Sequence, residues 1–275
     1  MNTTIAFIGG GNMARSLIGG LIANGQPAGQ IHVADPNAGT RRQLQTDFGI
    51  VVTTDNHRAF NACDVVVLAV KPQQMSQVCQ DLSTLTQVHR PLIISIAAGL
   101  RCADISRWLD AGIALVRTMP NTPALLGAGV TGLFANPHVS APQRKVAESI
   151  LAAAGHCHWV ADESLIDAIA AISGSGPAYF FLFIEALSQA GHALGLTTAV
   201  AEQLAVQTAL GAARMASETG TPARTLRQQV TSPGGTTERA LQVFEHGGLV
   251  DLVAAATRAA HRRAGDLAEQ LGADS

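Results

Sequence analysis

Two patterns of apolar residues divide the chain near residue 161. Before that point, short runs rich in Val and Ile alternate with segments of helical spacing, which is typical of strands buried on both faces between helices. The predicted strands are 5–8, 31–35, 51–53, 64–70, 92–99, 113–117, 130–134 and 156–160, with helices at 12–23, 38–48 and 141–154. Beyond it the predicted elements are all helices: 163–172, 177–194, 198–218, 222–229, 235–246 and 249–271. We therefore predict an α/β domain over residues 1–160 and an all-α domain over residues 161–275.

The turn after the first predicted strand has a composition suited to phosphate. Gly9, Gly11 and Ala14 form a G-x-G-x-x-A pattern between that strand and the next helix. Gly9 permits a tight turn, Gly11 lets a pyrophosphate approach the backbone, and Ala14 lets helix and strand pack closely. The helix N-terminus favours an anion through its free N–H groups and its dipole. We therefore predict a Rossmann-type, doubly wound, mainly parallel sheet that binds a dinucleotide at Gly9, Gly11, Asn12, Met13 and Ala14.

The second predicted strand ends in a carboxylate, Asp35. It lies about where such folds place an acid that accepts hydrogen bonds from the adenosine ribose. This position favours NAD, because a carboxylate would repel the 2′-phosphate of NADP. Arg41 and Arg42 follow closely and could instead receive that phosphate, or they could form a solvated helix face. These residues leave the form of the cofactor open.

Two other predicted strands end in residues that could contact a cofactor, because ligands bind outside the carboxyl ends of strands in open parallel sheets. The strongest strand pattern ends in Ala69-Val70-Lys71-Pro72, where the alternative is a surface lysine that begins a loop. Ala97 and Ala98 supply small side chains where a nicotinamide ring could lie. Farther along, Pro120 and Pro123 predict a rigid loop that is not helical.

Charge and cysteine usage favour a soluble, cytoplasmic protein. The net charge of −2 and the pI near 6.5 give no reason to expect nucleic acid or an anionic membrane as partner. The four cysteines have no paired spacing, as is typical of reduced thiols. Apart from the N-terminal run, which the glycine pattern explains, we expect no stretch long and uncharged enough to span a bilayer. His156 and His158 would share a strand face, but no third ligand has a recognisable spacing, so we predict no metal site.

Several helices after residue 161 are rich in Ala and apolar on more than one face. Such helices usually pack inside a bundle or against a second subunit, which predicts a homodimer. Two segments break the helical pattern: Ser-Gly-Ser-Gly-Pro-Ala-Tyr at 173–179 and Thr-Ser-Pro-Gly-Gly-Thr-Thr-Glu at 231–238. Each opens a helix, where backbone N–H and hydroxyl groups could bind a small carboxylate. Two capped loops without a ligand are the alternative.

Six segments together resemble the pyrroline-5-carboxylate reductases: 9–14, 70–72, 95–99, 119–123, 173–179 and 232–237. Their order and spacing match, and the resemblance runs from residue 4 to about residue 270. It implies an N-terminal Rossmann domain, a C-terminal helical domain that interlocks with its partner, and dimers that often assemble into decamers. The implied reaction transfers a hydride from NAD(P)H to C5 of Δ1-pyrroline-5-carboxylate and gives L-proline, in the last step of proline biosynthesis.

The resemblance also implies roles for single residues. The hydroxyl of Thr237 would approach the ring nitrogen, and it is the candidate catalytic group because a proton or hydrogen bond at nitrogen assists addition to C=N. Asn56 would lie on the adenosine side, and Gln229 replaces an asparagine that some relatives have near the cofactor. Asp35 replaces the small polar residue of many relatives, so the preference for NADPH should weaken towards dual use with NADH. The implied substrate site comprises Glu163, Ser175, Gly234, Gly235, Thr236 and Thr237.

Other classes match less well. β-Hydroxyacid dehydrogenases use a catalytic lysine in the second domain, and residues 161–275 contain no lysine. A non-catalytic NAD(P)-binding sensor would have no use for the Ser-Pro-Gly-Gly-Thr-Thr segment at 232–237. A reductase for a different cyclic imine is the third alternative.

Overall fold

The computed structural model describes residues 3–61, 63–109 and 112–273, and the chain forms two compact units. The first unit comprises the chain up to Ser175 together with the C-terminal segment from Ala260, and the second comprises Gly176–Ala259. The apolar pattern puts a boundary near residue 161, before the helix that begins at Leu165. That helix belongs to the first unit, as does the C-terminal segment, whose Gly272 carbonyl accepts a hydrogen bond of 2.9 Å from Arg107.

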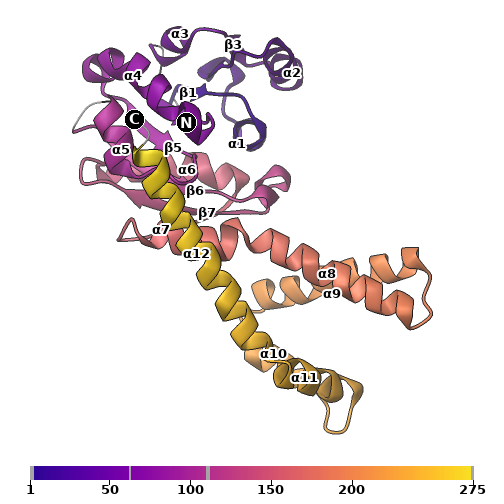
Figure 1. Ribbon diagram of the computed structural model, residues 1–275. Helices are drawn as coiled ribbons and strands as arrows, with labels where there is room; N and C mark the ends of the chain where they lie inside the picture. The colour runs from indigo at the N-terminus through magenta and orange to yellow at the C-terminus, as the bar shows by residue number, and fades with distance from the viewer. Residues whose placement is uncertain (1–2, 62, 110–111, 274–275) are drawn as a thin grey trace. The chain divides into compact units, whose positions relative to one another are not determined.

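The first unit is built on a β-sheet, several strands of which are labelled in Figure 1. The sheet has eight strands in the order β3-β2-β1-β4-β5-β6-β7-β8. All neighbouring strands are parallel except β6 and β7. The order 3-2-1-4-5-6 is that of a doubly wound dinucleotide-binding sheet, in which the direction of winding reverses between β1 and β4. The predicted α/β class and mainly parallel sheet are therefore confirmed. The strands are β1 (Ile5–Ile8), β2 (Ile31–Ala34), β3 (Val51–Thr53), β4 (Val65–Leu68), β5 (Leu92–Ser95), β6 (Leu115–Met119), β7 (Gly129–Ala135) and β8 (Gly155–Trp159).

Seven α-helices accompany this sheet within the described part of the first unit, besides the end of the C-terminal helix: α1 (Asn12–Ala23), α2 (Ala38–Phe48), α3 (Asn56–Phe60), α4 (Pro72–His89), α5 (Cys102–Leu109), α6 (Ala141–Leu151) and α7 (Leu165–Ile169). The sequence pattern does not predict α3, α4 or α5. α4 begins at a proline, whose fixed φ suits the first helical position. Most of its residues are polar, and its buried face is narrow: it consists of Met75, Cys79, Leu82 and Thr86. Two short 3₁₀ helices, η1 (Ala28–Gln30) and η3 (Ala152–Ala154), complete the connections.

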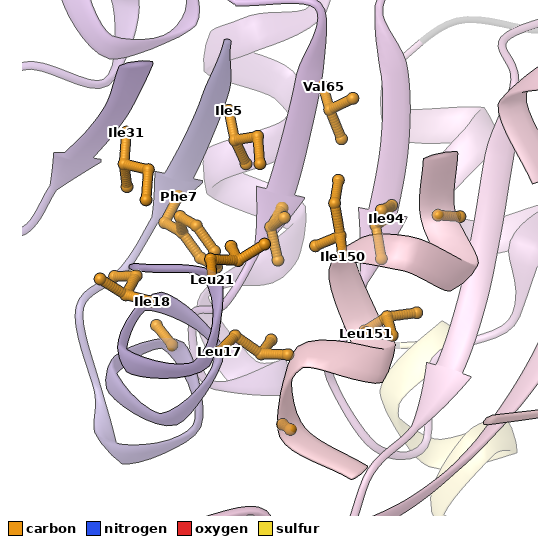
Figure 2. Close-up of a cluster of buried hydrophobic side chains, with 14 of the residues drawn as sticks. Ile5, Phe7, Leu17, Ile18, Leu21, Ile31, Val65, Ile94, Ile150 and Leu151 are labelled. Atoms are coloured by element: carbon orange, nitrogen blue, oxygen red, sulfur yellow. The ribbon is translucent and has the colours of Figure 1, made fainter. Parts of the chain in front are cut away.

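Alternate side chains of each central strand enter two separate cores, because successive residues point to opposite faces of a sheet. Ile5 and Phe7 of β1 pack with Leu17 and Ile18 of α1, and Figure 2 shows these side chains beside those of α6. Ala6 and Ile8 of the same strand face the other core, which α4 and α5 cover. All four β1 side chains are at most 1% exposed. The predicted reading of 5–8 as a strand buried on both faces is confirmed.

The proline-rich segment after β6 differs from the prediction. Thr122–Leu126 forms a 3₁₀ helix, η2, with Pro123 in its first turn, so the expectation of a wholly non-helical loop was wrong. A proline lacks an N–H group, but the first turn of a helix does not need that donor. The sequence rule therefore excludes proline from a helix interior, and not from its start.

The second unit consists of helices. They are α8 (Gly176–Ala193), α9 (Thr198–Glu218), α10 (Ala223–Gln229), α11 (Thr236–His246) and the first part of α12 (Leu249–Ala273). α8 and α9 pack side by side, and Gly191 leaves room for Ala201 at their contact (Figure 1). Only Gly176, Ala201 and Ala205 are buried in this unit. Large side chains such as Phe180 at 69% and Val250 at 76% are exposed instead.

One expectation about membranes was wrong. The continuous helical segment Leu165–Ala193 is long and apolar enough to cross a membrane by length and composition alone. Length and composition are weak evidence for a single helix, because the core helix of a soluble protein meets the same criterion. The exposed phenylalanines of α8 account for its apolar character.

Candidate active site

The glycine turn after β1 has the geometry that a phosphate requires. Gly9 has φ +100°, and a Cβ there would lie 2.6 Å from the carbonyl oxygen of Ala69, so β1 and β4 approach closely only because no side chain is present. Gly11 precedes α1, and no atom lies within 4 Å of the place of its missing Cβ. Among the described residues no side chain caps this helix. The free N–H groups of its first turn therefore face open space and can bind an anion.

Asp35 lies against the same turn. Its Oδ2 accepts a hydrogen bond of 2.8 Å from the N–H of Gly10, and its Oδ1 accepts one of 2.8 Å from the N–H of Asn37. Arg41 donates to the backbone carbonyl oxygen of Asp35 at 2.6 Å. A negative charge is thus held at the carboxyl end of β2, and one of the two candidate phosphate-binding arginines is tied to the backbone beside it.

The other predicted cofactor residues follow the neighbouring strands. The N–H of Ala69 donates to the carbonyl of Ile8 at 2.8 Å, which extends the pairing of β4 with β1. Lys71 is exposed and directly precedes α4, which begins at Pro72; it does not begin a loop. Asn56 is the first residue of α3. The structure therefore brings the residues at 9–14, 35, 56 and 69–72 to the same edge of the sheet.

A cavity of about 240 Å³ opens at the carboxyl ends of β5 and β6, wholly within the first unit. Small residues after β5, among them Ala97 and Ala98, form one wall. Asp167 of α7, Ser175 and Arg263 of α12 line other parts of it. Ala97 and Ala98, which were predicted to contact the cofactor, and Ser175, which was predicted to contact the substrate, therefore line the same cavity.

A buried ion network supports this cavity. Arg117 of β6 is 3% exposed, and its guanidinium pairs with Glu163 at 3.2 Å and with Asp167 at 2.9 Å. Glu163 Oε1 also accepts the N–H of Cys102 at 2.7 Å. Glu163, predicted to lie near the substrate, thus joins β6 to the start of α5 and does not line the cavity. Arg117 and Asp167 were not predicted as site residues, although an arginine within an apolar strand was a usable signal, because buried charges need partners.

Cys102 is not a nucleophile in this arrangement. Burial raises the pKa of its thiol, and the neighbouring Glu163 carboxylate raises the pKa further. The thiolate, which is the reactive form, is therefore disfavoured.

The segment 173–179 is a distortion of a helix and not a loop. α7 continues into a π-helical turn, η4 (Ala170–Gly174), and then into α8. A Cβ at Gly174 would lie 2.6 Å from Cε of Met119, so the end of that flexible side chain would have to move to accept any other residue. Asn121 donates to the carbonyl of Ser173 at 3.0 Å and so fixes the turn to the end of β6. Such π-turns occur frequently at functional sites.

The second predicted substrate segment lies in the other unit. Gly234 has φ +72°, its N–H donates to Oε2 of Glu238 at 2.8 Å, and the N–H of Gly235 donates to the carbonyl of Ser232 at 3.0 Å. These two N–H groups are therefore engaged. Those of Thr236 and Thr237 lie in the first turn of α11, which has no intrahelical acceptor for them. Thr237 is partly exposed.

Residues 163–267 match the family model for pyrroline-5-carboxylate reductase dimerisation, and residues 4–99 match one for NADP oxidoreductases dependent on coenzyme F420. The chain is 51% identical to the pyrroline-5-carboxylate reductase of Pseudomonas aeruginosa over 268 residues, which is 98% of both chains. The chain belongs to the pyrroline-5-carboxylate reductase family. The solved reductase of Coxiella burnetii is 48% identical and superposes with a TM-score of 0.95 over 97% of this chain and 99% of that one. A solved Plasmodium falciparum pyrroline carboxylate reductase with NADP bound is 28% identical, with a TM-score of 0.84 over 97% and 98%.

Membership of the pyrroline-5-carboxylate reductase family confirms the resemblance found in the sequence. The match to a dimerisation model falls on the part of the chain that begins at Glu163 and includes the helices with exposed apolar residues.

The His156 and His158 side chains are both exposed on one face of β8, and the described residues contain no group of three or more His, Cys, Asp or Glu suited to a metal ion.

Proposed function

We propose that this chain reduces Δ1-pyrroline-5-carboxylate to L-proline with a nicotinamide cofactor, as the last step of proline biosynthesis. The observation that carries the proposal is the 51% identity to the Pseudomonas aeruginosa reductase over 98% of both chains. The glycine turn and the cavity beyond β5 supply the features that a dinucleotide needs.

The dinucleotide fits the residues present. The first turn of α1 offers N–H groups to the pyrophosphate, and Gly11 leaves room for it. Asn56 and the segment 69–72 border the adenosine and ribose, while Ala97 and Ala98 leave space for a flat ring. When bound, the reduced nicotinamide supplies the hydride.

The substrate is held by polar groups of the chain. The hydroxyl of Thr237 donates a hydrogen bond to the imine nitrogen, or relays a proton to it, and so makes the carbon more electrophilic. The N–H groups of Thr236 and Thr237 bind the substrate carboxylate, and Gly234 and Gly235 shape that turn. Ser175, in the first unit, is a further residue that the resemblance assigns to the substrate. Glu163 acts indirectly, through its ion pair with Arg117. Alignment of the reacting groups contributes about 7–11 kcal/mol to the rate in well-oriented reactions.

The chain uses NADPH, and NADH as an alternative. Support for NADPH comes from the NADP oxidoreductase match and from the relative with NADP bound. Asp35 weakens this preference, because its carboxylate occupies the N–H groups of Gly10 and Asn37 that a 2′-phosphate would otherwise approach.

The working molecule is a homodimer in the cytoplasm. The dimerisation match and the exposed apolar helices support the dimer. Decamers are the further assembly that the resemblance implies. The four unpaired cysteines support a reducing compartment.

The experiment that tests the function measures oxidation of NADPH and NADH by the purified protein with Δ1-pyrroline-5-carboxylate. Turnover is the expected result. Asp35→Asn should raise the ratio of kcat/KM for NADPH over NADH by about tenfold, because it removes the charge that opposes a 2′-phosphate. Asp266→Asn, at an exposed position of α12, is the matched control and should leave that ratio unchanged. Failure to turn over substrate with either cofactor, in protein that still binds dinucleotide, would favour another cyclic imine or a sensor.

A further inference from the structure

The ion network beside the cavity does not balance its charges. It joins one guanidinium, Arg117, to two carboxylates, Glu163 and Asp167. Carboxylates are ionised at neutral pH, so the group carries one excess negative charge. Arg117 is 3% exposed and Asp167 is 8% exposed, which means that water screens this charge poorly.

The excess charge reaches the cavity through Asp167. Both Arg117 and Asp167 line the cavity, whereas Glu163 does not. Oδ1 of Asp167 accepts the hydrogen bond from Arg117, and Oδ2 takes no part in that contact. The cavity wall therefore presents a carboxylate of which one oxygen binds Arg117 and the other does not.

The sheet order places this wall on the nicotinamide side of the dinucleotide site. β5 is two strands away from β1, on the side opposite to β2. Neighbouring strands are about 4.8 Å apart, so the cavity begins roughly 10 Å across the sheet from the glycine turn. With the adenosine end at β2, the other end of an extended dinucleotide lies over β4 and β5.

We propose that the Asp167 carboxylate favours the oxidised, cationic nicotinamide over the reduced, neutral ring, and so stabilises the charge that develops when the ring gives up its hydride. This inference rests on the proposed function. In the reaction the ring loses a hydride and becomes positive, while the protonated imine gains that hydride and becomes a neutral amine. A fixed negative charge beside the ring assists this transfer of positive charge without having to move.

Two cations of the described chain also line the cavity, and one of them, Arg117, already pairs with both carboxylates. Arg263 of α12 also lines it, but its side chain is exposed and donates to Gln270 at 3.3 Å. Solvent therefore screens Arg263 more strongly than it screens Asp167. Asp167 should therefore favour the oxidised, cationic ring, and Arg263 should favour the reduced, neutral ring.

The test is the ratio of two dissociation constants, for NADP⁺ and NADPH, measured by titration calorimetry. Asp167→Asn keeps an oxygen for Arg117 and removes only the charge. We expect it to weaken binding of NADP⁺ relative to NADPH by about tenfold, the order of magnitude for a unit charge in a poorly screened site. Arg263→Gln should shift the ratio the opposite way by about two- to threefold, and this exposed position keeps the test available if Asp167→Asn does not fold.

Two control variants test whether the change in the ratio depends on where the removed charge lies. Glu163→Gln removes an equal charge from the same network but not from the cavity wall, so it should change the ratio less than Asp167→Asn does. Asp266→Asn removes an exposed charge elsewhere on α12 and should not change the ratio.

The inference is overturned if folded Asp167→Asn changes both constants equally, or leaves their ratio within twofold of wild type. It is also overturned if Glu163→Gln shifts the ratio as much, or if Arg263→Gln shifts it in the same direction. These constants need no substrate. A protein that binds both forms but does not reduce Δ1-pyrroline-5-carboxylate would therefore refute the proposed function and still report on Asp167.

Discussion

The two units of this chain contain similar apolar side chains but bury them very differently. In the first unit Phe7 and Ile8 are 0% exposed, because helices cover both faces of the strands. In the second unit Phe181 is 65% exposed and Leu252 is 66% exposed, and only three small residues are buried. A domain needs at least two packed layers around its core. The first unit completes its core alone, whereas the second presents a surface that requires a partner.

The polar groups of the two units differ in the same way. In the first unit Arg117 finds both of its carboxylate partners, Glu163 and Asp167, within a single chain. In the second unit the first turn of α11 leaves the N–H groups of Thr236 and Thr237 to be satisfied from outside. One unit is preorganised, and we expect a partner and the substrate to complete the other.

The largest effect should come from placing a charge on the exposed face of the second unit. Phe181 lies at a groove between α8 and α9, and Phe181→Asp would bury an unpaired carboxylate against the partner. The cost of about 3–5 kcal/mol should raise the dimer dissociation constant by roughly 200- to 5,000-fold. Sedimentation velocity over a dilution series measures it.

The matched control is Val88→Asp, since Val88 is 71% exposed on α4 of the first unit. It should leave the dimer intact. A Phe181→Asp protein that dimerises as tightly as wild type would remove α8 from the interface.

A smaller effect should show that catalysis depends on the second unit and dinucleotide binding on the first. Thr237→Ala should lower kcat/KM by about 10²-fold, the scale of a lost acid–base group. The dissociation constant for the dinucleotide should not change, because the glycine turn lies in the other unit. Steady-state kinetics and calorimetry measure the two quantities.

Thr257→Ala is a suitable control, because that hydroxyl donates to the Val253 carbonyl at 2.9 Å within α12 and should have no part in the reaction. Wild-type kcat/KM in Thr237→Ala would end the assignment of Thr237.

The smallest effect is a difference in response to alkali. Burial raises the pKa of Cys79 from 9.0 to about 12, so above pH 9 the unfolded chain releases a proton that the folded chain keeps. The stability from this group is present below pH 9 and is lost as the pH rises from 9 to 12. Between pH 8 and pH 10 wild type should lose about 1.4 kcal/mol more free energy of unfolding than Cys79→Ala.

Urea unfolding followed by tryptophan fluorescence measures this difference, because both tryptophans, Trp108 and Trp159, lie in the first unit. All four cysteines lie there too, so loss of the helical signal of the second unit should show no such dependence on pH. Equal pH responses of wild type and Cys79→Ala would show that the thiol is not shielded.

Local patterns predicted the elements of the first unit where burial is uniform. The strand pattern at 5–8 and the glycine spacing after it need only near neighbours in sequence, and both predictions hold. α4 was missed because only every third or fourth residue is apolar and polar residues dominate the rest. The small residues at 173–179 predict a break in the helical pattern, whereas the structure has a π-turn there, whose Ser173 carbonyl accepts a hydrogen bond from Asn121.

The sequence by itself determined the alternation of strands and helices, the glycine turn, the carboxylate at the end of β2, and the family. Each of these depends on residue type and spacing along the chain. Only the tertiary structure decided that Arg117 meets Glu163 and Asp167, residues about 50 positions later, that the end of α12 belongs to the first unit, and that Glu163 does not line the cavity. These depend on which distant segments share a low-dielectric interior, where an arginine must find its partners.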